Sequence, residues 1–143
     1  INAHGKTDLY FYEGMMNGEE YRKLLKKMLP QLKKLMPNKS FAFMQDGATC
    51  HTANATQQFI EEECKINFWK KSEWPAKSPD LNPIENIWAI LNVRVMKRNP
   101  VNQTELTRFS REKWKKITPE DLEKFTLPLP NRIQQVLAVN GLH

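Results

Sequence analysis

Apolar residues recur at helical spacing in the segment that follows Asn17. The recurring positions are Tyr21, Leu24, Leu25, Met28, Leu32, Leu35 and Met36. Lysine and arginine fill most positions between them, so the pattern predicts a helix with one apolar and one basic face. Asn17 stands three residues before Glu20, which is the spacing of a capping box at a helix start. Pro30 has no amide donor and is expected to kink or divide this helix.

Three short runs of mainly aromatic and aliphatic residues predict β-strands at 8–13, 41–46 and 66–69. The second of these runs ends on a carboxylate, Asp46, and a turn follows it. A helix is predicted over 52–63, between the second and third strands. Because strands and helices alternate in this way, the sequence indicates the α/β class.

A loop punctuated by prolines spans residues 74–83 and leads into another predicted helix. Asn82 is expected to cap this helix, with Pro83 in its first turn and Glu85 at its third position. The apolar face of the helix is predicted to consist of Ile84, Ile87, Trp88, Leu91 and Val95.

The last third of the chain is charged and has a helical pattern. Thr118 and Pro119, with acidic residues behind them, predict a capped helix start. A final short helix is predicted over 133–139, where Gly141 stops it. Since the sequence contains no internal repeat, we expect a single domain over residues 1–143.

The composition excludes two classes of protein. Apolar residues make up 40% and charged residues 27%, which is a globular mixture. No run approaches the ~18–20 consecutive apolar residues of a membrane span, which excludes an integral membrane protein. The two cysteines, Cys50 and Cys64, argue against a disulfide-rich secreted scaffold and fit a reducing compartment. Together with His51 they match no standard zinc-ligand spacing, so a zinc site is not favoured.

The net charge of +6, from 22 Lys and Arg against 16 Asp and Glu, makes nucleic acid a plausible partner. It is also an ordinary solubility charge, and the lysines of the first helix fit a solvated face. The candidate nucleic-acid contacts are Arg94, Lys97, Arg98 and Trp114. Trp114 lies among basic residues and could stack on a base, whereas core packing is the alternative for it and for Trp88.

Two carboxylates stand out by position. Asp46 ends an apolar strand, where side chains project into the crevice beyond the carboxyl ends of a sheet. Glu85 lies in the first turn of a helix, after a loop whose prolines fix its path. Carboxylates so placed can hold Mg²⁺, and a pair of such ions supports phosphodiester chemistry. The alternative is local: Asp46 accepts from turn amides, and Glu85 completes a capping box with Asn82.

Two motifs favour the metal-binding interpretation of Asp46 and Glu85. The segments QDGATCHTA at 45–53 and WPAKSPDLNPIENIW at 74–88 resemble mariner-type DDE transposases. Shorter segments at 5–11, 16–18 and 130–133 are also similar, so the resemblance covers nearly the whole chain. It implies a ribonuclease H-like fold with a three-carboxylate site that binds two Mg²⁺ or Mn²⁺ ions. It also implies cleavage of DNA at transposon ends and joining of the freed 3′ hydroxyl to a new site.

The resemblance assigns roles to single residues. Asp46 corresponds to the second carboxylate and Glu85 to the third, and both are expected to be catalytic metal ligands. His51, Asn82 and Asn86 fall at positions expected near the carboxylates or the DNA. For His51, a packed or solvent-facing side chain is the alternative.

The sequence also departs from the family pattern. Gly47 stands where Asn is usual and Thr49 where Pro is usual, which is expected to loosen the loop beside Asp46. The interval from Asp46 to Glu85, 39 residues (85 − 46), is a few residues longer than usual. The first carboxylate and the first strands of the fold are expected upstream of Ile1. Without that first strand, the strand that ends at Asp46 would keep an unpaired backbone edge.

The chain is therefore expected to be a C-terminal part of a transposase catalytic domain, with extra C-terminal helices. DNA is the expected partner, and the complete protein is expected to be a nuclear homodimer without membrane association. Little or no catalysis is expected of this chain alone, because a site that lacks one carboxylate binds metal weakly. The alternative is a catalytically inactive, domesticated or truncated remnant that acts as a DNA-binding or protein-association module.

Overall fold

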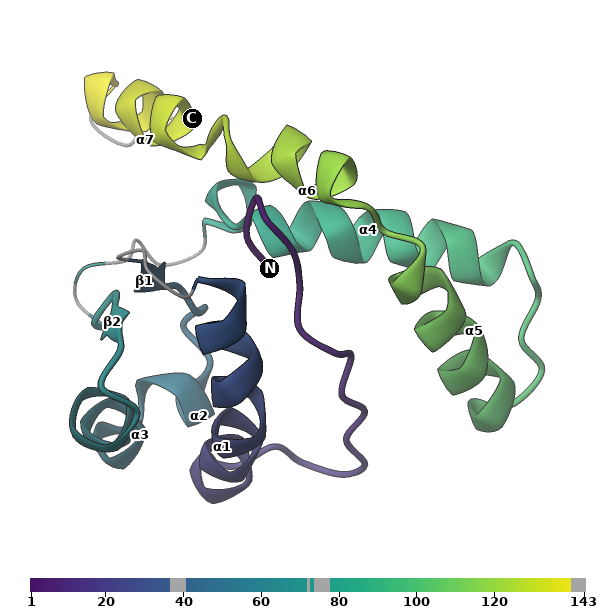
Figure 1. Ribbon diagram of the computed structural model, residues 1–143, viewed down its shortest axis with the longest axis horizontal. Coiled ribbons are helices and arrows are strands. Elements are labelled where there is room, and N and C mark those ends of the chain that lie inside the picture. Colours follow the sequence, from purple (N-terminus) through teal and green to yellow (C-terminus); the bar gives the residue numbers. More distant parts are fainter. Residues whose placement is uncertain (37–40, 72, 74–77, 140–143) are drawn as a thin grey trace. The chain divides into compact units, whose positions relative to one another are not determined.

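The computed structural model describes residues 1–36, 41–71, 73 and 78–139. The chain divides into two compact units. We call Tyr10–Lys77 the strand-bearing unit, and Ile1–Leu9 together with Ser78–His143 the helical unit. Figure 1 shows both units, with the α-helices and the two strands labelled. Each unit has its own hydrophobic core, so the site residues are described within the unit to which they belong.

Helices and two short strands make up the strand-bearing unit (Figure 1). In chain order they are α1 (Gly18–Leu35), β1 (Ala42–Phe43), α2 (Thr49–Thr52), α3 (Asn54–Gln58), the π-helical η1 (Phe59–Cys64) and β2 (Asn67–Phe68). The two strands are parallel, with Ala42 opposite Asn67 and Phe43 opposite Phe68. The amide of Trp69 extends the pairing by donating to the Phe43 carbonyl at 3.1 Å.

The core of this unit lies where α1 packs against the segment from α2 to η1. Its buried residues are Tyr21, Leu25, Cys50, Phe59, Ile60 and Cys64. Phe43 of β1 and Phe68 of β2 are partly buried against the same cluster. Because α2 and α3 are too short to be stable alone, this burial holds them in place. It also anchors the turn between β1 and α2, which carries Asp46.

The helical unit consists of η2 (Pro79–Leu81), a 3₁₀ turn, followed by α4 (Pro83–Met96), α5 (Gln103–Lys115), α6 (Pro119–Thr126) and α7 (Leu129–Ala138). Its core contains Ile87, Leu91, Val95, Phe109, Trp114, Ile117 and Leu122. Ile1 and Leu9 pack against this core from the start of the chain. Lys6 adds a bond, since its Nζ donates to the Ile117 carbonyl at 2.6 Å. Residues 1–9 are thereby fixed to helices that lie far along the sequence.

Two of the predicted helix starts are confirmed as capped ends. The Asn17 side chain accepts from the Glu20 amide at 2.9 Å. Thr118 begins α6 with a capping box. Its side chain accepts from the Asp121 amide, and the Asp121 side chain accepts from the Thr118 amide. Asn82 differs, because its side chain makes no capping hydrogen bond. Helix α4 begins instead with Pro83, whose missing amide needs no partner at this position.

The strands are shorter and fewer than the sequence predicts. Within 41–46 and 66–69 the strands are confirmed, although each has only two residues. The prediction of a strand at 8–13 is wrong, since these residues have no regular structure. A strand requires a neighbouring backbone to pair with, and the apolar pattern of 8–13 alone does not provide one. The described residues are thus mostly helical with one small parallel sheet, rather than evenly alternating α/β.

The helices also depart from prediction in three places. Pro30 lies inside α1, so the helix is not divided there, while the kink stays a prediction. The helix predicted over 52–63 begins at Asn54, because the backbone leaves the helical conformation at Ala53, and it continues as the π-helical η1 to Cys64. The last helix begins before residue 133, and Gly141 lies outside the described residues. Among the residues described, no helix is both long enough and apolar enough to span a membrane.

Candidate active site

Asp46 lies in the turn that joins β1 to α2, in the strand-bearing unit. Its Oδ1 accepts from the Ala48 amide at 3.0 Å and from Nδ1 of His51 at 2.6 Å. The first of these bonds is the local Asx turn typical of a strand-end aspartate. The second bond is to the side chain of His51 in α2 and fixes the direction of the carboxylate. The Asp46 side chain is nevertheless 57% exposed, so it remains open to a ligand.

His51 is held in place through both its ring and its backbone. The ring packs against that of Tyr21 from α1, with 4.1 Å between the centroids and 44° between the planes. The His51 carbonyl accepts from Nε2 of Gln57 at 2.9 Å. Because a carboxylate only accepts hydrogen bonds, we assign the hydrogen to Nδ1, facing Asp46.

The second oxygen of Asp46 has a different environment. Oδ2 makes no hydrogen bond to any described part of the chain, whereas Oδ1 makes both internal ones. An exposed carboxylate with one oxygen fixed and the other available fits a hard divalent cation such as Mg²⁺ or Mn²⁺. Across the described residues, no group of three or more His, Cys, Asp and Glu side chains is arranged to hold a metal. Asp46 is therefore one candidate ligand and not a complete site.

Glu85 lies in the first turn of α4, in the helical unit, and its side chain is exposed. Its amide donates to the Asn82 carbonyl at 3.0 Å, which closes the first turn of the helix. Leu81, Pro83 and Ile87 are buried around it and fix the direction in which α4 begins. The partial positive charge at a helix start favours a carboxylate here, whether or not a cation is bound.

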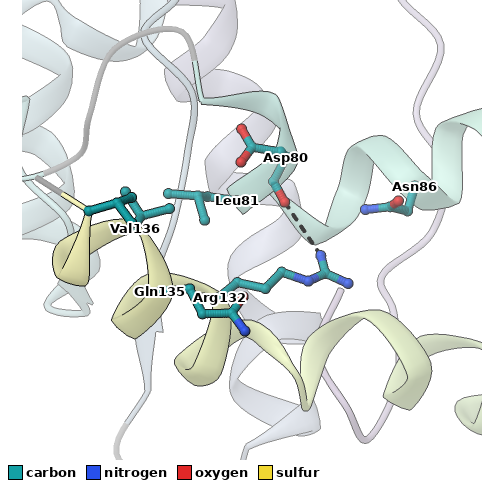
Figure 2. A pocket seen from close by; sticks show the side chains of 7 residues that line it. Asp80, Leu81, Asn86, Arg132, Gln135 and Val136 are labelled. Carbon is teal, nitrogen blue, oxygen red and sulfur yellow. Dashed lines mark hydrogen bonds between the residues drawn. The ribbon is translucent and has the colours of Figure 1, made fainter. Parts of the chain in front are cut away.

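A groove of about 480 Å³ lies beside Asn86, the residue after Glu85 (Figure 2). It is lined by Asp80, Leu81, Asn86, Arg132, Gln135, Val136 and Val139. Arg132 comes from α7, and its Nη1 donates to the Asp80 backbone carbonyl at 3.4 Å. That carbonyl is neutral, and no described acidic side chain forms an ion pair with Arg132. A guanidinium so placed fits a phosphate-bearing ligand.

Arg132 was not among the residues singled out from the sequence. The available signal was the PNRI segment at 130–133, which is part of the family resemblance. Nothing in that segment indicates that α7 packs against η2, which the structure shows. The neighbourhood of Arg132 and Asn86 is therefore a product of the tertiary fold.

The three basic residues predicted to contact nucleic acid differ in how available their charges are. Arg94 pairs with an aspartate of α6 at 3.5 Å. Arg98 pairs with Glu112, and its guanidinium lies 3.7 Å from the centre of the Phe109 ring. Lys97 is exposed and forms no ion pair with a described residue. Lys97 is thus the residue of the three whose charge is most available to a phosphate.

Trp114 is a core residue. It is 6% exposed, and its Nε1 donates to the Thr7 carbonyl at 2.9 Å. The rings of Trp88 and Trp114 stack, with centroids 5.4 Å apart and planes at 25°. These contacts cover the indole of Trp114 and leave no exposed face to stack on a base. These contacts favour the packing alternative for Trp114, because the start of the chain covers the ring, and the nucleic-acid role stays a prediction.

The predicted site residues fall into two groups. Asp46 and His51 are in direct contact in the strand-bearing unit. Asn82, Glu85 and Asn86 lie together at the start of α4 in the helical unit. The motif at 74–88 is described from residue 78 onward, where it forms η2 and the first turns of α4, while residues 74–77 lie outside the described residues.

Comparison with curated proteins finds transposases. The chain is 33% identical to "Transposable element Tc3 transposase" of Caenorhabditis elegans, over 95% of this chain and 41% of that protein. It is 26% identical to "Transposable element Tcb1 transposase" of Caenorhabditis briggsae, over 90% of this chain and 45% of that protein. With "Transposable element Tc1 transposase" of C. elegans it shares 29% identity, over 72% of this chain and 36% of the relative. The chain thus spans less than half the length of these relatives.

These relatives sharpen the family resemblance. The similarity is to Tc1-type transposases, by distant homology, rather than to mariner elements specifically. A family model described as DDE superfamily endonuclease matches residues 1–107, a range that includes Asp46, His51 and Glu85. Such a domain implies a ribonuclease H-like fold, to which the parallel pairing of β1 and β2 conforms. With most of its residues matched in this way, the chain belongs to the DDE superfamily endonucleases.

Proposed function

We propose that this chain is part of the catalytic domain of a DNA transposase that cuts DNA at transposon ends and joins the freed strand to a new site. The observation that carries the proposal is the arrangement at Asp46, where Oδ1 is fixed by two hydrogen bonds and Oδ2 is available to a ligand. Glu85 is the other proposed metal-binding carboxylate of this chain, the third of the family's set, and a first carboxylate completes the set in the complete protein. Both residues lie within the segment matched to the endonuclease family.

Mg²⁺ and Mn²⁺ are the proposed cofactors, because both candidate ligands are carboxylate oxygens. A pair of such ions, when bound, activates an attacking oxygen and stabilises the leaving oxygen of a phosphodiester. The contribution of the chain itself is to hold its carboxylates still. His51 and the Ala48 amide fix Asp46, and the buried start of α4 fixes the backbone of Glu85.

DNA is the proposed partner, and its phosphates are the proposed targets of the basic residues. Lys97 and Arg132 have no acidic partner among the described residues, so their charges are the most available for this role. Arg94 and Arg98 are proposed as weaker contacts, because their charges are already engaged within the chain. We further propose that the complete protein acts as a homodimer in the nucleus, where its DNA substrate is found.

The test is a metal-dependent nicking assay on transposon-end DNA with the complete protein. Asp46→Asn and Glu85→Gln are expected to abolish cleavage and to leave DNA affinity nearly unchanged, because each removes a metal ligand without changing a DNA contact. Glu123→Gln is the matched control, because it replaces an exposed carboxylate on α6, and this variant should cleave like the parent. Cleavage by Asp46→Asn at the parental rate would refute the assignment.

The same experiment separates catalysis from the alternative of an inactive remnant. If the complete parent protein binds DNA with a steep salt dependence but does not cleave it with Mg²⁺ or Mn²⁺, the chain belongs to a DNA-binding module. If cleavage depends on metal and on both carboxylates, the remnant hypothesis is excluded.

A further inference from the structure

A chain of contacts leads from α1 to the carboxylate of Asp46. The hydroxyl of Tyr21 donates to Oε1 of Gln45 at 2.8 Å. The amide of the same Gln45 donates to the His51 carbonyl at 3.4 Å, so its two polar ends bridge α1 and α2. The His51 ring in turn packs against the Tyr21 ring, and its Nδ1 bonds Oδ1 of Asp46.

The starting point of this network is rigid. Tyr21 is 7% exposed and belongs to the core of the strand-bearing unit. Burial raises the pKa of the Tyr21 phenol, so the hydroxyl keeps its hydrogen and acts as the donor to Gln45. Gln57 adds a second anchor from α3 by donating to the His51 carbonyl at 2.9 Å. His51 is therefore restrained at its ring by Tyr21 of α1, and at its backbone by Gln57 of α3 and by Gln45 from the segment between β1 and α2.

The network ends on one oxygen only. Nδ1 of His51 contacts Oδ1 of Asp46, and the Ala48 amide donates to that same oxygen. Because Oδ1 accepts both hydrogen bonds, rotation of the carboxylate about the Cβ–Cγ bond of Asp46 would break them both. Oδ2 is thus held in a fixed direction, which an Asx turn alone would fix less well because it supplies only one of the two bonds.

We propose that Tyr21, Gln45 and His51 are positioning residues that orient the Asp46 carboxylate so that Oδ2 is presented to a divalent cation. This inference rests on the proposed function, in which Asp46 is a metal ligand. Partners that orient a metal-binding side chain in this way commonly contribute a 10- to 100-fold effect on metal affinity or activity. The network adds no ligand of its own and acts only through Asp46.

Variants of His51 provide the sharpest test, because Asn and Leu have nearly the same size. His51→Asn places an amide nitrogen where Nδ1 stands and keeps the bond to Asp46, whereas His51→Leu removes it. We expect His51→Leu to weaken Mn²⁺ binding to the complete protein about 10- to 100-fold, as measured by electron paramagnetic resonance of free Mn²⁺. His51→Asn is expected to recover most of this loss.

Tyr21→Phe tests the far end of the network, because it removes the hydroxyl and keeps the ring against His51. Loss of this one neutral hydrogen bond is expected to weaken Mn²⁺ binding by about fivefold. Tyr12→Phe is the matched control, since the Tyr12 hydroxyl donates only to the Met15 carbonyl, at 3.2 Å, away from Asp46. Thr52→Val controls for stability, because it removes a side-chain bond to the Ala48 carbonyl and leaves the Tyr21, Gln45 and His51 side chains unchanged.

A spectroscopic measurement tests the contact without any metal. Ring-nitrogen NMR of the 143-residue chain is expected to show hydrogen on Nδ1 of neutral His51 and none on Nε2. Tyr21→Phe is expected to weaken this preference, while Tyr12→Phe and Thr52→Val retain it.

The outcomes separate the two proposals. Parental Mn²⁺ affinity in both Tyr21→Phe and His51→Leu, together with an unchanged His51 ring spectrum in Tyr21→Phe, would overturn the positioning network, even where Asp46→Asn abolishes binding and cleavage. A parent ring with hydrogen on Nε2 and none on Nδ1 would overturn it as well. Parental Mn²⁺ binding and cleavage by Asp46→Asn would instead refute the proposed function, and with it the metal-directed role of the network.

Discussion

Replacing Trp114 by phenylalanine tests whether this residue supports the fold or contacts DNA. Phenylalanine keeps an aromatic ring against Trp88 but loses the Nε1 donor that bonds the Thr7 carbonyl at 2.9 Å. Thr7 is 8% exposed, so its carbonyl would lose its partner in a site that water hardly reaches. An unsatisfied buried acceptor costs about 1–3 kcal/mol. We therefore expect Trp114→Phe to lower the free energy of unfolding by about 1–3 kcal/mol.

Urea unfolding followed by circular dichroism measures this loss, and fluorescence anisotropy with labelled DNA measures affinity on the same samples. Trp88→Phe is the matched control, because the Trp88 indole nitrogen has no hydrogen bond to a described residue and the side chain is 39% exposed. The DNA affinity of folded Trp114→Phe is expected to equal that of the parent. Parental stability together with a clear loss of DNA affinity would show that Trp114 stacks on bases and that the packing argument is wrong.

Three other perturbations test the remaining structural claims. Thr118→Ala removes the capping box of α6 and is expected to lower the free energy of unfolding by about 1 kcal/mol in urea titrations; no loss would contradict the cap. Burial raises the pKa of Tyr21 above its usual 10.0, so the unfolded chain loses this proton first and stability should fall as the pH rises past that value. Tyr21→Phe should flatten that fall, and an equal fall in both proteins would refute the assignment. Arg132→Ala should weaken DNA binding and lower the salt slope by about one, whereas an unchanged slope would show that Arg132 contacts no phosphate.

The features that the sequence predicted correctly are mostly local. Asn17 caps α1 and Thr118 caps α6 through bonds to residues three positions away, so the pattern of neighbours suffices to place them. Pro83 begins α4 for the same kind of reason. The motif around Asp46 and Glu85 indicated the endonuclease family, because its length and composition are specific without reference to the fold.

Long-range contacts decided the features that local patterns predicted wrongly or left open. The run 8–13 has the composition of a strand, yet it forms none, because pairing depends on a distant backbone. His51 could have been packed, exposed or close to Asp46, and the choice came from a core that α1 supplies through Tyr21. No helix or strand propensity encodes that contact.

Trp114 shows most clearly how local sequence patterns differ from long-range contacts in what they decide. Its basic neighbours in sequence predicted a DNA-facing side chain, and those neighbours are real. The residue that satisfies its indole, Thr7, lies 107 positions away. The sequence by itself therefore determined the family, the capped helices and the two candidate carboxylates, since each depends on residues close together in the chain. Burial and orientation were decided by the tertiary structure, because both depend on which distant residues fold against a side chain and exclude water from it.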